Sequence, residues 1–338
     1  MNIMISIVAV AFNEARHVAR LQQSIARLVR PSDIAVESLL VDGGSTDGTA
    51  AFAVAAGFTR VLELPGASIP VCRNRGVAAA TGTWIAFVDA DCELAPDWLA
   101  CAFPLMCRER PLLLGWPAAP PEPMNWLQRA WFIHWTCKNP AREDWHGVPV
   151  VRAEGFRLAT TRNMLLHREV FDHLGGFNEQ LHTGEDTDFA FRAYMAGIPV
   201  LGVPGLRVWH HAEPATLRQF FRQQLWHANR RSYEHIRRLS GGRIGGNAPR
   251  FTWLFLLCFA VALAGVVGAV SFSLAVLVLL LPLLMLIFGP ALLIGWRARK
   301  PTIVLPLGVI YFVYGLARSI DLLGWHRQKP SWKKTKDS

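Results

Sequence analysis

The stretch Trp84-Ile85-Ala86-Phe87-Val88-Asp89-Ala90-Asp91 decides the fold class of this chain. Its first five residues are apolar without alternation, which is typical of a strand buried on both faces of a parallel sheet. Two carboxylates, Asp89 and Asp91, follow the strand directly. Ligands of parallel sheets bind beyond the carboxyl ends of the strands, so these acids stand where a ligand is expected.

The residues before this stretch repeat the same arrangement. Strands are expected at 3–12, 37–41 and 61–64, and each is followed by a helical pattern. The first helix has its apolar residues on one face and ends at Pro31; the others are expected near 49–56 and 71–80. Strands that alternate with helices at this spacing predict an α/β domain with a mostly parallel, Rossmann-like sheet flanked by helices.

Polar residues stand at three of the predicted strand ends. They are Asn13-Glu14 after the first strand, Asp42 after the second, and Asp89 with Asp91 after the fourth. Because carboxyl ends of parallel strands meet at one edge, we expect these groups to converge. Each motif has a simpler explanation when taken alone: paired acids are common in turns, and Asp42 begins a Gly-rich turn that a helix cap would also explain.

The paired acids suit a divalent cation. Asp89 and Asp91 can hold Mg²⁺ or Mn²⁺, with a diphosphate completing the ligand shell. Trp209 is followed by His210-His211, where a histidine could be a metal ligand or a structural residue. Arg73 and Asn74, on the helix before the acidic strand end, could reach a phosphate or a base.

A second acidic pair, Glu185-Asp186, opens a predicted helix that runs to Met195. The pair could supply a general base that deprotonates a hydroxyl. It could equally serve the helix, because Thr183-x-x-Asp186 resembles a capping box and acids suit a helix N-terminus. Asp188, in the next turn, is expected to cap the helix or to face solvent.

Charge and hydropathy divide the chain unevenly. Of 35 Lys and Arg and 25 Asp and Glu, residues 217–338 contain 17 basic residues but only three acids, so the first two-thirds are net negative. Residues 251–296 contain no charged side chain. A basic segment around long apolar runs indicates a membrane and anionic lipid, and it argues against a nucleic-acid partner.

The apolar region is too long for one crossing of a membrane. We expect spans near 251–270 and 274–296, preceded by a basic juxtamembrane linker at 236–250. A third apolar run ends near residue 323, and a basic tail occupies 324–338. Basic clusters stay on the cytoplasmic side, so two crossings place the catalytic part and the tail in the cytoplasm and make the third run interfacial or re-entrant.

Taken together and in order, these motifs resemble glycosyltransferase family 2. The resemblance covers roughly residues 1–235 and rests on six short motifs: the strand leading into Asn13-Glu14, Val41-Asp42-Gly43-Gly44-Ser45-Thr46-Asp47-Gly48-Thr49, Arg73-Asn74-Arg75-Gly76, Asp89-Ala90-Asp91, Gly175-Gly176-Phe177 and Gly184-Glu185-Asp186. Each motif is weak, whereas the six in this order are specific. The resemblance implies a GT-A catalytic domain on residues 1–235, followed by transmembrane helices.

The resemblance also implies roles for individual residues. Donor contacts would come from Asn13, Glu14, Asp42, Arg73, Asn74 and Asp89, and metal ligands from Asp89, Asp91 and His211, with His210 the neighbouring choice. Asp186, supported by Glu185, would take the acceptor proton during inverting transfer from a nucleotide-diphosphate sugar. The membrane segments suggest a bacterial-type inner membrane and a lipid-linked or glycan acceptor, by analogy alone.

Two departures from the family pattern limit these expectations. Many members carry two consecutive aspartates where this chain has Asp42-Gly43, so a UDP donor is not implied. Processive synthases carry Gln-x-x-Arg-Trp, whereas this chain has Gln223-Gln224-Leu225-Trp226. Single addition is therefore favoured over processive synthesis.

Other functions remain open at this stage. A catalytically degenerate family member could bind a nucleotide or act as a membrane assembly partner without transfer, although it would have no reason to retain four converging acids. An NAD-dependent oxidoreductase would show G-x-G-x-x-G after the first strand, where Ala11-Phe12-Asn13-Glu14 stands instead. The sequence does not specify the donor sugar, the nucleotide base, the acceptor or the oligomeric state.

Overall fold

The computed structural model describes residues 3–108, 111–138, 141, 143–152, 155–181, 183–227, 230–239, 241, 247–268 and 274–323. The chain divides into two compact units. The first comprises Met1–Pro121 and Asn139–Ala212, and the second comprises Glu122–Lys138 and Glu213–Lys329. The predicted tail at 324–338 and the predicted break at 271–273 lie outside the described residues.

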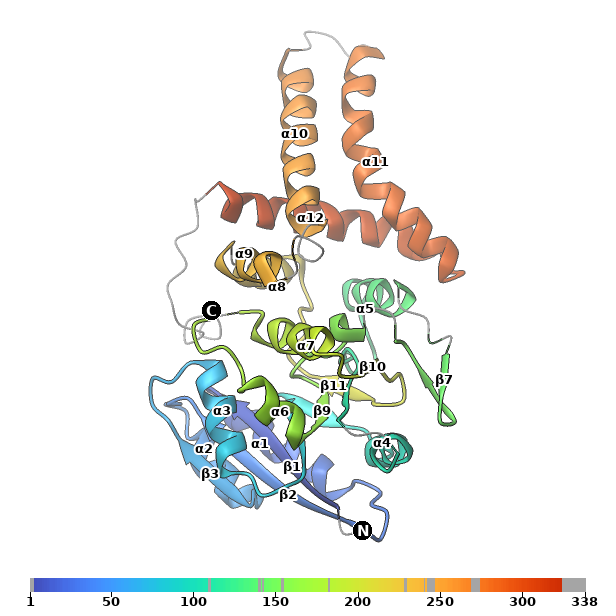
Figure 1. The fold of residues 1–338 in the computed structure, drawn as a ribbon. Helices are drawn as coiled ribbons and strands as arrows, with labels where there is room; N and C mark the ends of the chain where they lie inside the picture. Colours follow the sequence, from blue (N-terminus) through green and yellow to red (C-terminus); the bar gives the residue numbers. More distant parts are fainter. Residues whose placement is uncertain are drawn as a thin grey trace. The chain divides into compact units, whose positions relative to one another are not determined.

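The first unit is built on a seven-stranded sheet in the order β10-β6-β9-β4-β1-β2-β3 (Figure 1). All neighbouring pairs are parallel except those of β9 with β4 and with β6. The mostly parallel sheet predicted from the sequence is confirmed. The strands are β1 (Ile3–Ala11), β2 (Ile34–Asp42), β3 (Arg60–Glu63), β4 (Trp84–Asp89), β6 (Leu113–Gly115), β9 (Met164–His167) and β10 (Val200–Gly202).

Helices cover this sheet, and short elements extend it. The helices are α1 (Ala15–Ala26), α2 (Thr49–Ala56), α3 (Ile69–Ala79), α4 (Trp98–Met106), η1 (Gly155–Arg157), α6 (Arg168–Leu174) and α7 (Glu185–Met195). Two small antiparallel pairs are β5 (Cys92–Leu94) with β11 (Val208–His210), and β7 (Glu143–Trp145) with β8 (Val148–Val150).

The core of the first unit follows from the apolar pattern. β1 is buried along almost its whole length, and the predicted face of α1, with Val18, Leu21 and Ile25, packs in the same cluster. Gly76 lets α3 lie directly on the sheet, since a Cβ there would come within 2.4 Å of Val8 Cγ1. α3 contains the predicted site residues Arg73 and Asn74, so this close packing fixes the position of their backbone relative to the sheet.

The strand ends converge as predicted. The last residue of β1, Ala11, is paired with Asp42 of β2, and Val10 is paired with Asp89 of β4. Three strand ends therefore stop at nearly the same level of one sheet edge. One expectation is wrong at this edge: Asp188 neither caps α7 nor faces solvent but is fully buried.

The second unit consists of helices. They are α5 (Trp126–Lys138), α8 (Leu217–His227), α9 (Arg230–Leu239), α10 (Asn247–Gly268), α11 (Leu274–Arg297), η2 (Pro301–Ile303) and α12 (Val304–Leu322). Their apolar residues form one cluster that includes Phe220 of α8, Phe255 of α10 and Leu307 of α12. The sequence did not indicate that α5, far away in the chain, belongs to this cluster.

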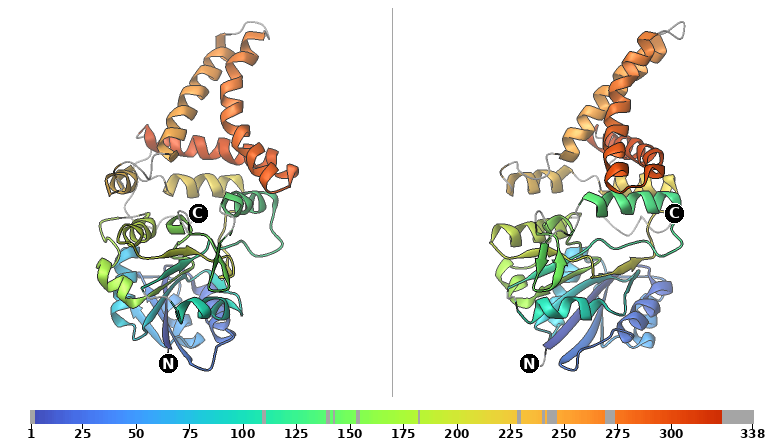
Figure 2. Two further views of the ribbon diagram at one scale, coloured as in Figure 1. Left: turned by 45° about the vertical axis from the view of Figure 1, so that its right-hand side comes forward. Right: turned by 90° about the vertical axis from the view of Figure 1, so that its right-hand side faces the viewer.

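Three helices of the second unit are long and apolar enough to cross a membrane, over Arg250–Val267, Val278–Arg297 and Pro301–Ile320. α10 and α11 lie side by side, with Gly265 against Leu279, while α12 lies across the ends of both (Figures 1 and 2). Within the third window 44% of the residues are buried, against 22% and 28% in the first two. α12 is thus more covered by the rest of the protein than α10 or α11 is, and the interfacial or re-entrant position of this run stays a prediction.

Candidate functional site

Two polar loops at the sheet edge are bound to each other. Asp42 Oδ1 accepts hydrogen bonds from the backbone N–H groups of Gly44 and Ser45 and from the Ser45 hydroxyl. Asn13, with φ at 55°, accepts one from the Thr46 N–H, and its own N–H donates to Ser45 Oγ. Asp42 therefore builds its own turn, and its contact with a nucleotide stays a prediction.

Glu14 leads to a histidine that the sequence analysis missed. Glu14 Oε2 lies 2.7 Å from Nδ1 of His17, in the first turn of α1. Burial lowers the pKa of His17, while the nearby Asp91 carboxylate opposes this shift. His17 therefore lies within electrostatic reach of the acidic strand end. The position of His17, one helical turn after the polar end of the first strand, is the sequence feature that could have identified it.

Arg73 connects the two acidic motifs. Its guanidinium is buried, donates a 3.1 Å hydrogen bond to Asp89 Oδ1, and donates a short one to Glu185 Oε1. Asp89 retains 30% exposure of its side chain, whereas Glu185 retains 8%. Asp89, a predicted donor contact, and Glu185, the neighbour of the predicted base, therefore bind the same cation, Arg73.

The pKa of the buried Glu185 carboxyl group is raised. Burial raises its pKa to about 7, against the opposing effect of Arg73, and the neighbouring Asp186 adds to the rise. Asp186 is only partly buried. Of the pair, Asp186 is thus the carboxylate with access to solvent, while Glu185 is the one fixed by Arg73.

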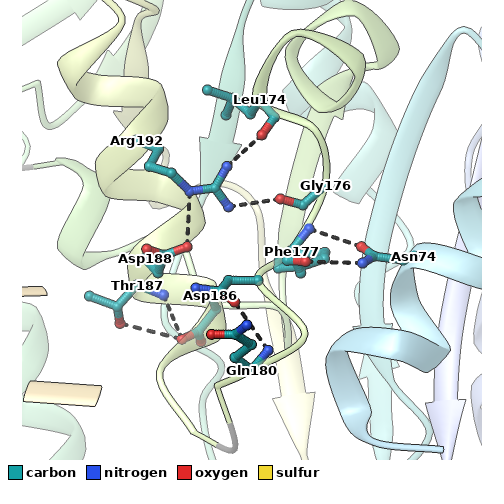
Figure 3. A network of polar contacts seen from close by, with 10 residues as sticks. Asn74, Leu174, Gly176, Phe177, Gln180, Asp186, Thr187, Asp188 and Arg192 are labelled. Carbon is teal, nitrogen blue, oxygen red and sulfur yellow. Dashed lines mark hydrogen bonds and ion pairs between the residues drawn. The ribbon is translucent and has the colours of Figure 1, made fainter. Parts of the chain in front are cut away.

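The start of α7 is held in place by buried polar contacts (Figure 3). Arg192 Nε donates to the buried Asp188 carboxylate at 2.9 Å. Its other guanidinium nitrogens each donate to a backbone carbonyl, of Leu174 and of Gly176, at 2.7 Å. The buried charge of Asp188 therefore links α7 to the Gly-Gly-Phe turn, which explains why the expectation of a solvent-facing residue failed.

Asn74 supports the same turn from the side of α3. Its amide donates to the Phe177 carbonyl and to Glu179, and its oxygen accepts from the Phe177 N–H at 2.9 Å (Figure 3). The predicted capping box is not formed, because α7 begins after Gly184 in the left-handed region with no side-chain cap. Asp186 accepts instead from the N–H of its neighbour Thr187.

The second acid of the strand end faces a histidine. Asp91 Oδ2 lies 3.2 Å from His210 Nε2, and both residues are buried. Burial by itself would raise the pKa of Asp91, but the charge of His210 and the hydrogen bond with it outweigh this effect and lower the pKa to about 2. Asp91 is therefore a carboxylate in its charged, metal-binding form at neutral pH.

Among the described residues, one group has a spacing that could hold a metal ion: Asp91, Cys92 and His210, with ligand atoms within 4.8 Å of one another. A charged carboxylate beside an imidazole fits a divalent cation, and the nitrogen favours Mn²⁺ over Mg²⁺, which takes oxygen ligands. The predicted ligand His211 pairs with Glu93 at 2.8 Å, and Asp89 pairs with Arg73. Their metal roles stay predictions.

The chain matches a known family over half of its length. The sequence profile described as glycosyl transferase family 2 matches residues 6–175. A relative described as uncharacterized glycosyltransferase YibD, from Escherichia coli (strain K12), is 38% identical over 73 residues, which cover 20% of this chain and 21% of the relative. The aligned regions span between 21% and 41% of the lengths of the curated relatives.

Solved structures show the same fold. The mannosyltransferase PcManGT from Pyrobaculum calidifontis, in complex with GDP-Man and Mn²⁺, superposes with a TM-score of 0.63 at 17% identity, over 94% of this chain and 87% of that one. TarS 1-349 from S. aureus, in complex with UDP, gives 0.52 at 16% identity, over 96% and 93%. The GT-A fold predicted from the motifs is confirmed.

Proposed function

Because this chain belongs to glycosyl transferase family 2, we propose that it moves a sugar, with inversion, from a nucleotide-diphosphate donor to an acceptor held at a membrane. The observation that carries the proposal is the Arg73 bridge, which ties Asp89 of the donor side to Glu185 beside the catalytic base Asp186. PcManGT and TarS are described with GDP-Man and UDP. Those descriptions support a nucleotide-sugar donor here.

We assign the donor contacts to the edge where β1, β2 and β4 end. Asn13, Asp42 and Asp89 border the place where the nucleoside would bind, with Glu14 and Asn74 supporting the loops around it. Asp91 and His210 would hold the divalent cation, with His211 and Asp89 as predicted alternatives. When bound, the cation would neutralise charge on the departing nucleotide diphosphate.

The acceptor hydroxyl attacks the anomeric carbon from the face opposite the leaving group. The new C–O bond forms as the bond to the diphosphate oxygen breaks, and the hydroxyl proton passes to Asp186. Arg73 keeps Glu185 and the first turn of α7 in place, so that the Asp186 carboxylate keeps its position during the reaction. The nucleoside diphosphate leaves with the electron pair of the broken bond, and Asp186 holds the proton, so atoms and charge balance.

A membrane-held acceptor is proposed because of the second unit. Its three long apolar helices suggest a membrane anchor, and an enzyme fixed to a membrane meets lipid-linked or exopolysaccharide precursors at high local concentration. We place the catalytic unit in the cytoplasm of a bacterial-type cell, since the basic residues flanking α10 and α11 would face that side.

Calorimetric titration of the purified full-length protein tests the donor proposal. UDP, GDP, CDP and dTDP are titrated with and without Mn²⁺, into the wild type, Asp91→Asn and the control Asp33→Asn. Asp33 is exposed and precedes β2, at the opposite end of the strand. We expect metal-dependent binding of one nucleotide that Asp91→Asn loses and Asp33→Asn keeps. If no nucleotide binds to the folded protein, the transferase proposal fails, and a catalytically degenerate protein that acts as a membrane assembly partner becomes the better explanation.

A further inference from the structure

The second unit contains a hollow of about 420 Å³ between α5 and the residues that follow α11. Its polar lining includes Glu122, Arg129 and Lys300, and its apolar lining includes Phe132 and Ile133. We propose that this hollow binds the phosphate headgroup of an anionic membrane lipid, whose acyl chains leave along the apolar surface of α11. The proposal holds whether or not the first unit transfers a sugar.

The length of α11 places the hollow at the membrane surface. α11 has 24 residues and contains no charged side chain before Arg297. A helix of this length spans about 36 Å, slightly more than the ~30 Å hydrocarbon core. Both ends of α11 can therefore reach the headgroup regions, and the exposed Arg297, Arg299 and Lys300 assign its second end to the cytoplasmic side.

Exposed tryptophans occur on three helices of the second unit. Trp296 near the end of α11 is 78% exposed, and Trp253 near the start of α10 is 60% exposed. On α5, Trp126 is 49% exposed and Trp135 is 37% exposed. Tryptophan side chains gather where hydrocarbon meets headgroups, because their rings are apolar and their N–H groups seek water. The two exposed tryptophans of α5, which forms one wall of the hollow, therefore suit a position of this helix at headgroup depth.

The chemistry of the lining fits a phosphate carried by an apolar chain. The Arg129 side chain is 55% exposed, and its Nη2 lies 3.8 Å from Glu122 Oε2, which is too far for a hydrogen bond. Lys300 supplies a second cation. Phe132 and Ile133 offer apolar surface beside the two cations, which a free phosphate would not use. Basic hollows beside membrane helices on this side are suited to lipid headgroups.

Titration of the detergent-solubilised full-length protein, followed by native mass spectrometry, tests the proposal. The probes are phosphatidylglycerol and phosphatidylcholine with identical acyl chains. We expect the anionic lipid to bind more tightly, and the Arg129→Gln/Lys300→Gln variant to bind it about 25-fold more weakly, about fivefold for each cation removed. The matched control, Arg218→Gln/Arg222→Gln, removes two exposed cations of α8 that do not line the hollow.

Three outcomes would overturn the proposal. Equal weakening in the control would mean that anionic lipid is attracted by the overall charge and not by the hollow. Unchanged lipid binding in the Arg129→Gln/Lys300→Gln variant would show that the hollow takes no headgroup. Displacement of the lipid by millimolar inorganic phosphate would point to a simple anion site. Nucleotide binding measured on the same samples separates each outcome from a failure of the proposed donor site.

Discussion

Replacement of Arg73 by methionine should destabilise the catalytic unit in a pH-dependent way. The folded-state pKa of Glu185 is raised to about 7, above its usual 4.5. The stability that Glu185 contributes is therefore fully present below about pH 4.5 and is lost as the pH rises through 7. Arg73→Met removes the cation that opposes the rise, so the pKa of Glu185 should move higher still.

The magnitude depends on whether Glu185 is charged. At pH 8 Glu185 is mostly ionised in the wild type, whereas a pKa well above 8 keeps it protonated in the variant. Because the wild-type pKa is about 7, this difference adds at most about 1.4 kcal/mol, the equivalent of one pKa unit, to the loss seen at low pH. At pH 5 Glu185 is protonated in both proteins, and the loss is that of a hydrogen bond, about 1 kcal/mol. The contact of Arg73 with the partly exposed Asp89 is lost at both pH values and largely cancels in the comparison.

Thermal unfolding followed by tryptophan fluorescence measures the difference. For a unit of this size, 1 kcal/mol corresponds to about 2–4 °C, so the Tm should fall by about 5–10 °C at pH 8 and by about 2–4 °C at pH 5. Adding Glu185→Gln to Arg73→Met should remove most of the pH dependence, because no buried carboxylate remains. An equal fall in Tm at both pH values, or a double variant as pH-sensitive as the single one, would refute the reasoning.

Three further predictions concern the same edge of the sheet. Asp186→Asn should lower transfer by about 10²–10⁴-fold with nucleotide affinity unchanged, as measured by nucleotide release and by calorimetry; a parallel loss of affinity would argue against the role of base. His210→Gln should weaken Mn²⁺-dependent nucleotide binding at least about tenfold more than His211→Gln, and the reverse order would return the ligand role to His211. Gly76→Ala should destabilise the first unit by about 1–3 kcal/mol through the clash with Val8, and an unchanged Tm would show that α3 can move away from the sheet.

The sequence predicted the convergence of the acids but not their partners. Strands of uninterrupted apolar residues specify a buried parallel sheet, and polar groups at their ends must then share an edge. Which acid pairs with which cation depends on the direction of the side chains and on differences of about an ångström in distance. Neither can be derived from the spacing of residues along the sequence. From the sequence, Arg73 could reach a phosphate or a base, and only its burial between Asp89 and Glu185 shows which acids it pairs with.

The two histidines show the same limit. His210 and His211 are adjacent in sequence and equally able to bind a metal, so a motif cannot separate them. In the antiparallel pairing of β11 with β5, His210 stands opposite Cys92, and the backbone N–H of His211 donates to the Asp91 carbonyl. The imidazole of His210 then meets the Asp91 carboxylate, while that of His211 turns to Glu93.

Gly76 and Arg73 together make α3 the element on which the donor side and the base side both depend. Gly76 lies three residues, almost one helical turn, after Arg73, and its missing side chain lets the helix rest on Val8 of β1. Because α3 lies this close to the sheet, the Arg73 guanidinium can reach both Asp89 at the end of β4 and Glu185 at the start of α7. A side chain at position 76 that lifted α3 by even a fraction of an ångström would lengthen both contacts at once. Gly76→Ala should therefore weaken donor binding and transfer together, whereas Asp186→Asn should affect transfer alone.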